Sequence, residues 1–92
     1  MLEKAIERRL LEMVKRHGGL CLKLTGYCGI PDRVLLTADG KVVFTEIKRP
    51  GIKLRPEQEA WQRKLRKMGF DALTIDSYDA VDRMKLFLTG SK

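Results

Sequence analysis

The chain opens with a stretch in which apolar residues recur every three to four positions. This spacing predicts a helix over residues 2–17, because it places the apolar side chains on one face. Two consecutive glycines, Gly18 and Gly19, end the helix. The apolar face consists of Leu2, Ile6, Leu10, Met13, Val14 and His17.

Two later stretches have the same helical spacing. Pro56 suits the first turn of a second helix, which ends at Gly69. A last helix follows Asp76 or Ser77, either of which can cap it. We expect the tail after it, residues 89–92, to be frayed. The residues that share one face of the second helix are Gln58, Trp61, Gln62, Leu65 and Met68, and the apolar stripe of the last helix consists of Ala80, Val81, Met84, Phe87 and Leu88.

Period-two alternation of side chains predicts four strands. Asp39-Gly40 marks a hairpin turn between the second and the third strand. Pro31 belongs at the start of the second strand, because it cannot donate to a ladder. The element order is therefore α-β-β-β-α-β-α, which predicts one α/β domain over residues 1–92. The expected strands cover residues 20–25, 33–37, 42–48 and 71–75.

The third strand carries apolar and charged side chains in the same row. Val42 and Phe44 alternate into Glu46 and Lys48, while Val43, Thr45 and Ile47 lie on the other side. We expect the first row to face the core and to end in a site at the lip of the sheet. The alternative is a strand that simply leaves the core, with both charges solvated. For Glu-x-Lys alone that alternative is favoured, because the tripeptide is common.

The predicted hairpin favours a site at the lip of the sheet over two solvated charges. Antiparallel pairing brings Asp32, at the start of the second strand, beside Glu46 and Lys48 at the end of the third. Two carboxylates are hard oxygen ligands that suit Mg²⁺ or Mn²⁺. Lys48 can orient or deprotonate a water molecule, or stabilise charge in a transition state.

The charge of the chain indicates the partner. Its 92 residues carry a net charge of +7 and have a pI near 9.7, which favours a polyanion, most often nucleic acid. A membrane surface is the competing polyanion, but acidic residues interrupt the polar face of the first helix. We expect Arg49, Lys53 and Arg55, in the loop after the site, and Lys23 to contact DNA. Phosphodiester hydrolysis is the chemistry that these features favour.

Other classes of protein fit less well. No apolar run approaches the roughly 20 residues that span a bilayer, and no signal peptide is evident, so we expect a cytoplasmic protein without a membrane partner. Cys21 and Cys28 have neither C-x-x-C nor zinc-ribbon spacing, and buried or half-buried thiols are expected.

The motif Gly29-Ile30-Pro31-Asp32, followed by Glu46-Ile47-Lys48, resembles the PD-(D/E)xK nuclease superfamily. More narrowly, the chain resembles the VRR-NUC (virus-type replication-repair nuclease) domain in its small stand-alone phage and bacterial form. The resemblance extends from about residue 3 to about residue 85. The remaining matching features are Glu7 in the leading helix, Arg49-Pro50-Gly51, Leu54-Arg55-Pro56-Glu57-Gln58, Trp61 and Gly69.

The resemblance implies a restriction-endonuclease-like fold, with a central mixed sheet flanked by helices. It implies a metal bound by Asp32, Glu46 and the main-chain carbonyl of Ile47. It also implies catalytic roles for Gln58 and for a carboxylate of the leading helix. We assign that carboxylate to Glu7, a further candidate ligand, and Glu3 is the alternative.

Stand-alone members of this family are similar to Holliday-junction resolvases, which are homodimers that cut branched DNA. The resemblance thus implies a Mg²⁺- or Mn²⁺-dependent endodeoxyribonuclease acting on four-way junctions in a phage or bacterial host. The alternatives are a fork, flap or nicking nuclease, a non-catalytic DNA-binding module on the same fold, and a protein-interaction domain. A homodimer also fits an apparent surplus of apolar side chains, for which the candidates are Trp61, Met68, Met84, Phe87 and Leu88.

Overall fold

A computed structural model of the chain describes residues 2–88, apart from the side chain of Phe87. The expected frayed tail lies outside the described residues. The predicted order of elements is confirmed, except that the last helix consists of two short ones. Ser77, and not Asp76, caps the first of these by accepting a hydrogen bond from the Ala80 N–H. The elements are α1 (Leu2–Arg16), β1 (Leu20–Lys23), β2 (Arg33–Leu36), β3 (Val42–Ile47), α2 (Pro56–Lys67), β4 (Asp71–Ile75), α3 (Tyr78–Arg83) and α4 (Lys85–Leu88).

The strands form a mixed sheet in the order β1-β2-β3-β4. β1, β2 and β3 pair antiparallel, and β3 pairs parallel with β4. Because parallel neighbours need a crossover, α2 provides the connection from β3 to β4. The β2–β3 hairpin pairs Leu36 with Val42 and Arg33 with Thr45. This register sets Asp32 opposite Glu46, as the alternation predicts.

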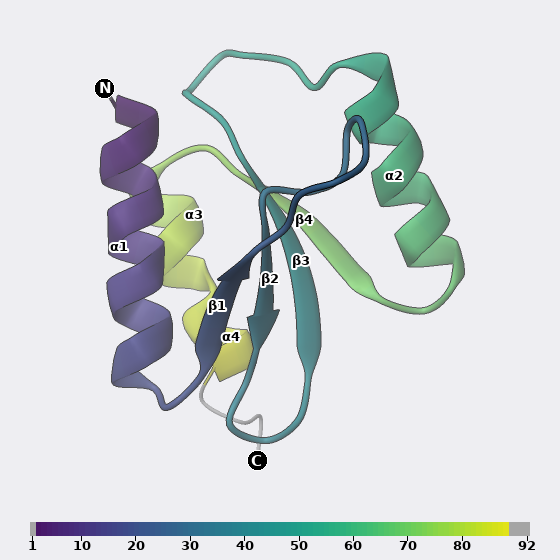
Figure 1. Cartoon of the computed structure of the whole chain (residues 1–92). Coiled ribbons are helices and arrows are strands. Elements are labelled where there is room, and N and C mark those ends of the chain that lie inside the picture. Colours follow the sequence, from purple (N-terminus) through teal and green to yellow (C-terminus); the bar gives the residue numbers. More distant parts are fainter. Residues whose placement is uncertain (1, 89–92) are drawn as a thin grey trace.

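Helices cover both sides of the sheet (Figure 1). α1, α3 and α4 pack on one side, and α2 lies on the other side beside β4. The hydrophobic core lies between the sheet and the α1 side, where Leu10, Leu35, Val43 and Val81 have no exposed surface. Burial of one such side chain stabilises a fold by roughly 1.5–3 kcal/mol. The remaining core residues are Ile6, Met13, Val14, Ile47, Ile75, Ala80, Met84 and Leu88.

This arrangement corrects the expected orientation of β3. Val43 and Ile47 face the main core, whereas Val42 and Phe44 are half-buried on the α2 side. The Phe44 ring packs edge-on against Phe70, with 5.4 Å between the centroids. Alternation shows which residues share a side of the sheet, but not which side receives the larger apolar helix.

The apolar surplus also differs from the expected set. Met84 and Leu88 are buried in the core, and Trp61 is half-buried, while Met68 is exposed as expected. Phe87 lies outside the described side chains. Further exposed apolar side chains lie on the α2 side of β1. There α2 packs on β4, reaches β3 through the Gln58–Glu46 hydrogen bond, and leaves Leu20 and Leu22 of β1 57% and 44% exposed.

Candidate active site

Asp32 and Glu46 meet where β2 begins and β3 ends. The Asp32 carboxylate accepts a hydrogen bond from the Ile47 N–H, with 2.8 Å between Oδ2 and N. The Asp32 carbonyl accepts another from the Leu24 N–H at 3.0 Å. These two bonds tie Asp32 to the chain on either side, so the carboxylate is fixed against the end of β3.

Glu46 is an acidic side chain that is almost completely removed from solvent, with 3% of its surface exposed. Its Oε2 accepts a hydrogen bond from the Gln58 amide at 2.5 Å. Its Oε1 is buried and has no hydrogen-bond partner among the described residues. Burial and the nearby Asp32 raise the pKa of Glu46 to about 7, against the opposing influence of Lys48 and Arg55.

This pair of residues fits a divalent cation. Two neighbouring carboxylates repel each other when both are charged, and a hard cation relieves that repulsion. The buried Oε1 of Glu46 also lacks the partner that a buried charged oxygen normally has. Within residues 2–88, no group of three or more His, Cys, Asp or Glu side chains comes together. Further ligands would therefore be main-chain oxygens such as the Ile47 carbonyl, water or phosphate.

Lys48 and Gln58 are the other predicted site residues that the structure brings near Glu46. The Lys48 N–H donates to the Ile75 carbonyl at 3.0 Å, which extends the β3–β4 pairing by one residue. Gln58 accepts from the Arg55 N–H at 2.8 Å and donates to Glu46. A single amide thus closes the first turn of α2 and orients the carboxylate, which accounts for a buried glutamine at this position.

Glu7 is the predicted site residue that the structure places elsewhere. Its Oε2 accepts a hydrogen bond from Nε of Arg33 at 2.8 Å, within a partly buried salt bridge. Arg33 also donates to the Cys21 carbonyl. Glu7 thus lies on the α1 side of the sheet, and its salt bridge is to Arg33, the residue after Asp32. Its alternative, Glu3, is exposed in the first turn of α1.

The four predicted DNA-binding residues are all exposed, but they do not lie together. Arg49, Lys53 and Arg55 lie in the loop that connects the site to α2. Lys23 is at the end of β1 and pairs with Arg33, so its side chain is on the α1 side. The loop residues are therefore the ones that adjoin the carboxylates.

The loop before Asp32 has a contact that the sequence analysis did not predict. The Trp61 indole donates to the Cys28 carbonyl at 3.0 Å, so α2 holds this loop in place. Gly29 has a φ of +81°, and a Cβ there would lie 2.6 Å from the Cβ of Glu57. Two features therefore require glycine at this position: the positive φ angle and the close approach of Glu57. The glycine of the G-x-P-D motif was the available sequence signal.

The expectation of buried or half-buried thiols is confirmed at Cys21 and wrong at Cys28. Cys21 is half-buried and Cys28 is exposed, and both are free thiols. Burial raises the pKa of the Cys21 thiol to about 11. Among the described residues, no helix is both long enough and apolar enough to cross a membrane.

Comparison with known proteins gives three findings. The model of the VRR-NUC domain family matches residues 4–78. "Putative nuclease p44" of Acyrthosiphon pisum secondary endosymbiont phage 1 is 35% identical over 79 residues, which are 84% of this chain and 85% of that protein. A solved structure described as a VRR_NUC domain superposes with a TM-score of 0.85 at 28% identity, over 90% of this chain and 92% of that one.

Proposed function

The chain belongs to the VRR-NUC domain family of nucleases, and from this premise we propose that it is an endonuclease that hydrolyses branched DNA with the aid of Mg²⁺ or Mn²⁺. The observation that carries the proposal is the buried Glu46 carboxylate beside Asp32, with one oxygen that has no described partner. A charged group is costly to bury unless it is paired or binds a cation. A role in cation-dependent hydrolysis would account for the burial of this carboxylate.

Asp32, Glu46 and the Ile47 carbonyl are the proposed cation ligands. When bound, the cation would neutralise charge on a phosphate oxygen and lower the pKa of a water molecule. Asp32 is held for this task by the Ile47 N–H, and Glu46 is held by the Gln58 amide. Both hydrogen bonds fix the direction in which the carboxylate oxygens point.

Lys48 is the proposed partner of the scissile phosphate. Its side chain leaves β3 on the same side as Glu46, and its charge lowers the pKa of that carboxylate, so the two groups are close. An ammonium there can orient or deprotonate the attacking water, or stabilise charge that develops on the phosphate. Because Lys48 is not a proposed ligand, its removal should change the rate of cleavage and not the affinity for the cation.

DNA would approach over the basic loop between the site and α2. Arg49, Lys53 and Arg55 are exposed there, and each can contact a phosphate without reading sequence. A net charge of +7 on 92 residues supports such binding. A non-catalytic DNA-binding module is the rival reading, but it gives no reason for two carboxylates beside a lysine at this position.

Preference for a four-way junction would require two active sites, since two strands must be cut. A C2 homodimer supplies the second site in the simplest closed arrangement. The exposed side chains of Leu20, Leu22 and Phe70, on the α2 side of the sheet, offer an apolar surface for self-association. We therefore propose that this side of β1 contributes to the dimer interface.

The decisive experiment compares cleavage of a labelled four-way junction with that of a matched linear duplex. Each substrate is incubated with Mg²⁺, with Mn²⁺ and with EDTA. We expect paired nicks in opposed strands of the junction, little cutting of the duplex and none in EDTA. Cleavage in EDTA would contradict the proposed requirement for a divalent cation. Nicks confined to one strand of a fork or flap would replace the resolvase-like activity with that of a fork or flap nuclease.

A further inference from the structure

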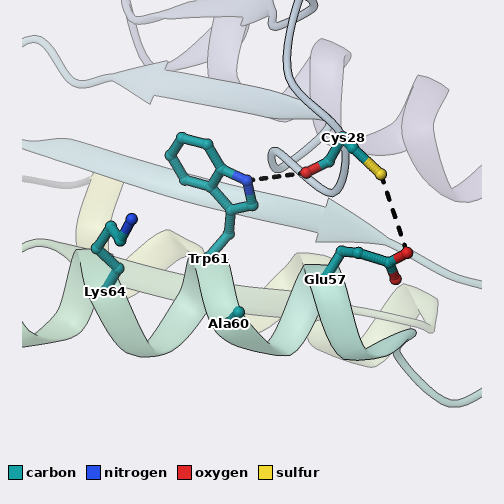
Figure 2. A pocket seen from close by; sticks show the side chains of 5 residues that line it. All are labelled: Cys28, Glu57, Ala60, Trp61 and Lys64. Atoms are coloured by element: carbon teal, nitrogen blue, oxygen red, sulfur yellow. Dashed lines mark hydrogen bonds between the residues drawn. The ribbon is translucent and has the colours of Figure 1, made fainter.

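A pocket of about 250 Å³ lies between α2 and the loop that precedes Asp32. Figure 2 shows Glu57, Trp61 and Lys64 rising from α2 and Cys28 facing them from the loop. The pocket is smaller than the roughly 300–1,000 Å³ of sites for drug-sized ligands, so it suits one planar ring system. Ala60 completes the lining.

Contacts between the loop and α2 hold the two walls of the pocket together. Trp61 is hydrogen-bonded to the Cys28 carbonyl at 3.0 Å, and Cys28 Sγ lies 3.9 Å from a Glu57 oxygen. Gly29 brings the loop against the backbone of α2 more closely than any other residue could. A site that is already formed loses little conformational entropy when it binds its ligand.

Beside the pocket, Tyr27 adds an exposed aromatic ring to the Trp61 and Lys64 side chains of the lining. The Tyr27 side chain is 70% exposed, and its ring centroid lies 5.8 Å from that of Trp61, with the rings tilted by 55°. Lys64 Nζ lies 5.7 Å from the Trp61 ring centroid. A tyrosine this exposed adds little to a core. Aromatic rings beside a lysine are the combination with which proteins bind unpaired bases, through stacking and phosphate contact.

Two segments of the chain connect the pocket to the candidate active site. Glu57 precedes Gln58, whose amide holds Glu46. Cys28 lies on the loop that ends at Asp32. A nucleotide in the pocket would therefore be near the phosphate at the carboxylates, within the same bound DNA.

We propose that this pocket binds one unpaired nucleobase of the DNA substrate, stacked against Tyr27 and Trp61. Lys64 is placed to contact the adjoining phosphate. The Glu57 carboxylate is an acceptor for an exocyclic amine, which favours cytosine over thymine. The proposal rests on the nuclease function proposed above, and it supplies a reason for preferring branched DNA. A base at a junction is more easily unstacked than one inside a continuous duplex.

The single tryptophan of the chain makes the test direct, because Trp61 reports its own surroundings. The fluorescence of the protein is titrated in EDTA with short oligo-dC, with oligo-dT and with a fully paired hairpin duplex. We expect quenching by the single strands, tighter binding of oligo-dC than of oligo-dT, and little quenching by the hairpin. The measurement contains no cation and no cleavage, so it is independent of the catalytic proposal.

Tyr27→Ala supplies the decisive variant, and Tyr78→Ala is its matched control. Tyr78 is also exposed, but it lies over Arg9 at the α1–α3 contact, away from the pocket. Loss of one stacking partner should weaken oligo-dC binding by roughly 5- to 150-fold in Tyr27→Ala. Tyr78→Ala and Tyr27→Phe should bind like the unmodified protein, and circular dichroism should show all three folded.

Three results would overturn the proposal. The first is equal quenching by the hairpin and by the single strands. The second is an equal effect of Tyr27→Ala and Tyr78→Ala. The third is a shift of the emission maximum with protein concentration in the absence of DNA, because it would show that a second copy of the chain covers Trp61. Junction cleavage that persists alongside any of these leaves the catalytic proposal standing. Quenching by the single strands without cleavage in Mg²⁺ would support the base-binding pocket and contradict the nuclease proposal.

Discussion

On the α1 side of the sheet, β3 contributes Val43, Thr45 and Ile47 to a buried layer beneath three helices. On the α2 side the same strand contributes Phe44 and then Glu46, beneath one helix. On the first side, β3 excludes water with apolar side chains, apart from Thr45, whose hydroxyl donates to the Arg33 carbonyl. The second side excludes water from a carboxylate. The α1 side therefore stabilises the fold through apolar burial. The α2 side holds a buried carboxylate, and the stability of the rest of the fold offsets the cost of that burial.

The largest expected effect tests whether the α2 side is catalytic. Glu46→Gln should lower junction cleavage by roughly 10²–10³-fold or more, since a neutral amide is a poor ligand for a divalent cation. Binding of DNA should remain near that of the unmodified protein. Glu59→Gln, on an exposed position of α2, is the matched control. Normal cleavage by Glu46→Gln, in a preparation free of other nucleases, would contradict the site.

A second pair of substitutions tests whether the α1 side carries the stability. Leu10→Ala opens a cavity in the core and should lower the free energy of unfolding by about 2–5 kcal/mol. Leu22→Ala changes a side chain that is 44% exposed on the α2 side and should cost under about 1 kcal/mol in the monomer. Chemical denaturation of both variants at low protein concentration measures the difference. Equal losses would mean that the two sides contribute alike.

The pH dependence of stability sharpens the comparison further. Folding raises the pKa of Glu46 from 4.5 to about 7, so the folded protein keeps a proton that the unfolded chain releases between these pH values. Without a cation, stability should therefore fall as the pH rises from 4.5 to 7, by about 3 kcal/mol. Urea denaturation in EDTA at pH 5 and at pH 8 measures this. Glu46→Gln should flatten the profile, and parallel profiles for the two proteins would show that Glu46 is not responsible.

Glu7 gives the smallest expected effect on cleavage, because its hydrogen bond is to Arg33 and not to either carboxylate. Glu7→Gln breaks a partly buried pair with Arg33 and should lower the free energy of unfolding by about 1 kcal/mol. Cleavage should fall by less than about tenfold, since Glu7 acts on Asp32 only through Arg33. Arg33→Ala should lower cleavage to a similar extent. A loss as large as that of Glu46→Gln would instead make Glu7 a direct ligand.

The sequence was sufficient for those features that depend on neighbours along the chain. Alternation and the Asp39-Gly40 turn predicted the hairpin register, and with it the meeting of Asp32 and Glu46. The G-x-P-D and E-x-K motifs indicated the family that the comparisons confirm. These inferences hold because a two-stranded register is fixed by local rules.

Features that depend on tertiary packing were not predictable in the same way. The choice of Val43 and Ile47 for the main core depends on which helices cover each side. Glu7 was expected near the carboxylates, but in the structure its carboxylate forms a salt bridge with the guanidinium of Arg33. The contact of Gly29 with Glu57 joins two segments that no local pattern connects.

The hairpin also bears on the order in which a folding chain can build this site. β2 and β3 are joined by a short turn, and such local pairs form within microseconds. The parallel pair of β3 and β4 must wait for the longer crossover through α2, because its loop-closure entropy is larger. Asp32 and Glu46 can thus become neighbours while both are still hydrated. Because Gln58 of α2 donates to Glu46 in the folded protein, we expect full burial of Glu46 to require the docking of α2. The energetic penalty of the buried carboxylate therefore falls on the slower, non-local step of folding.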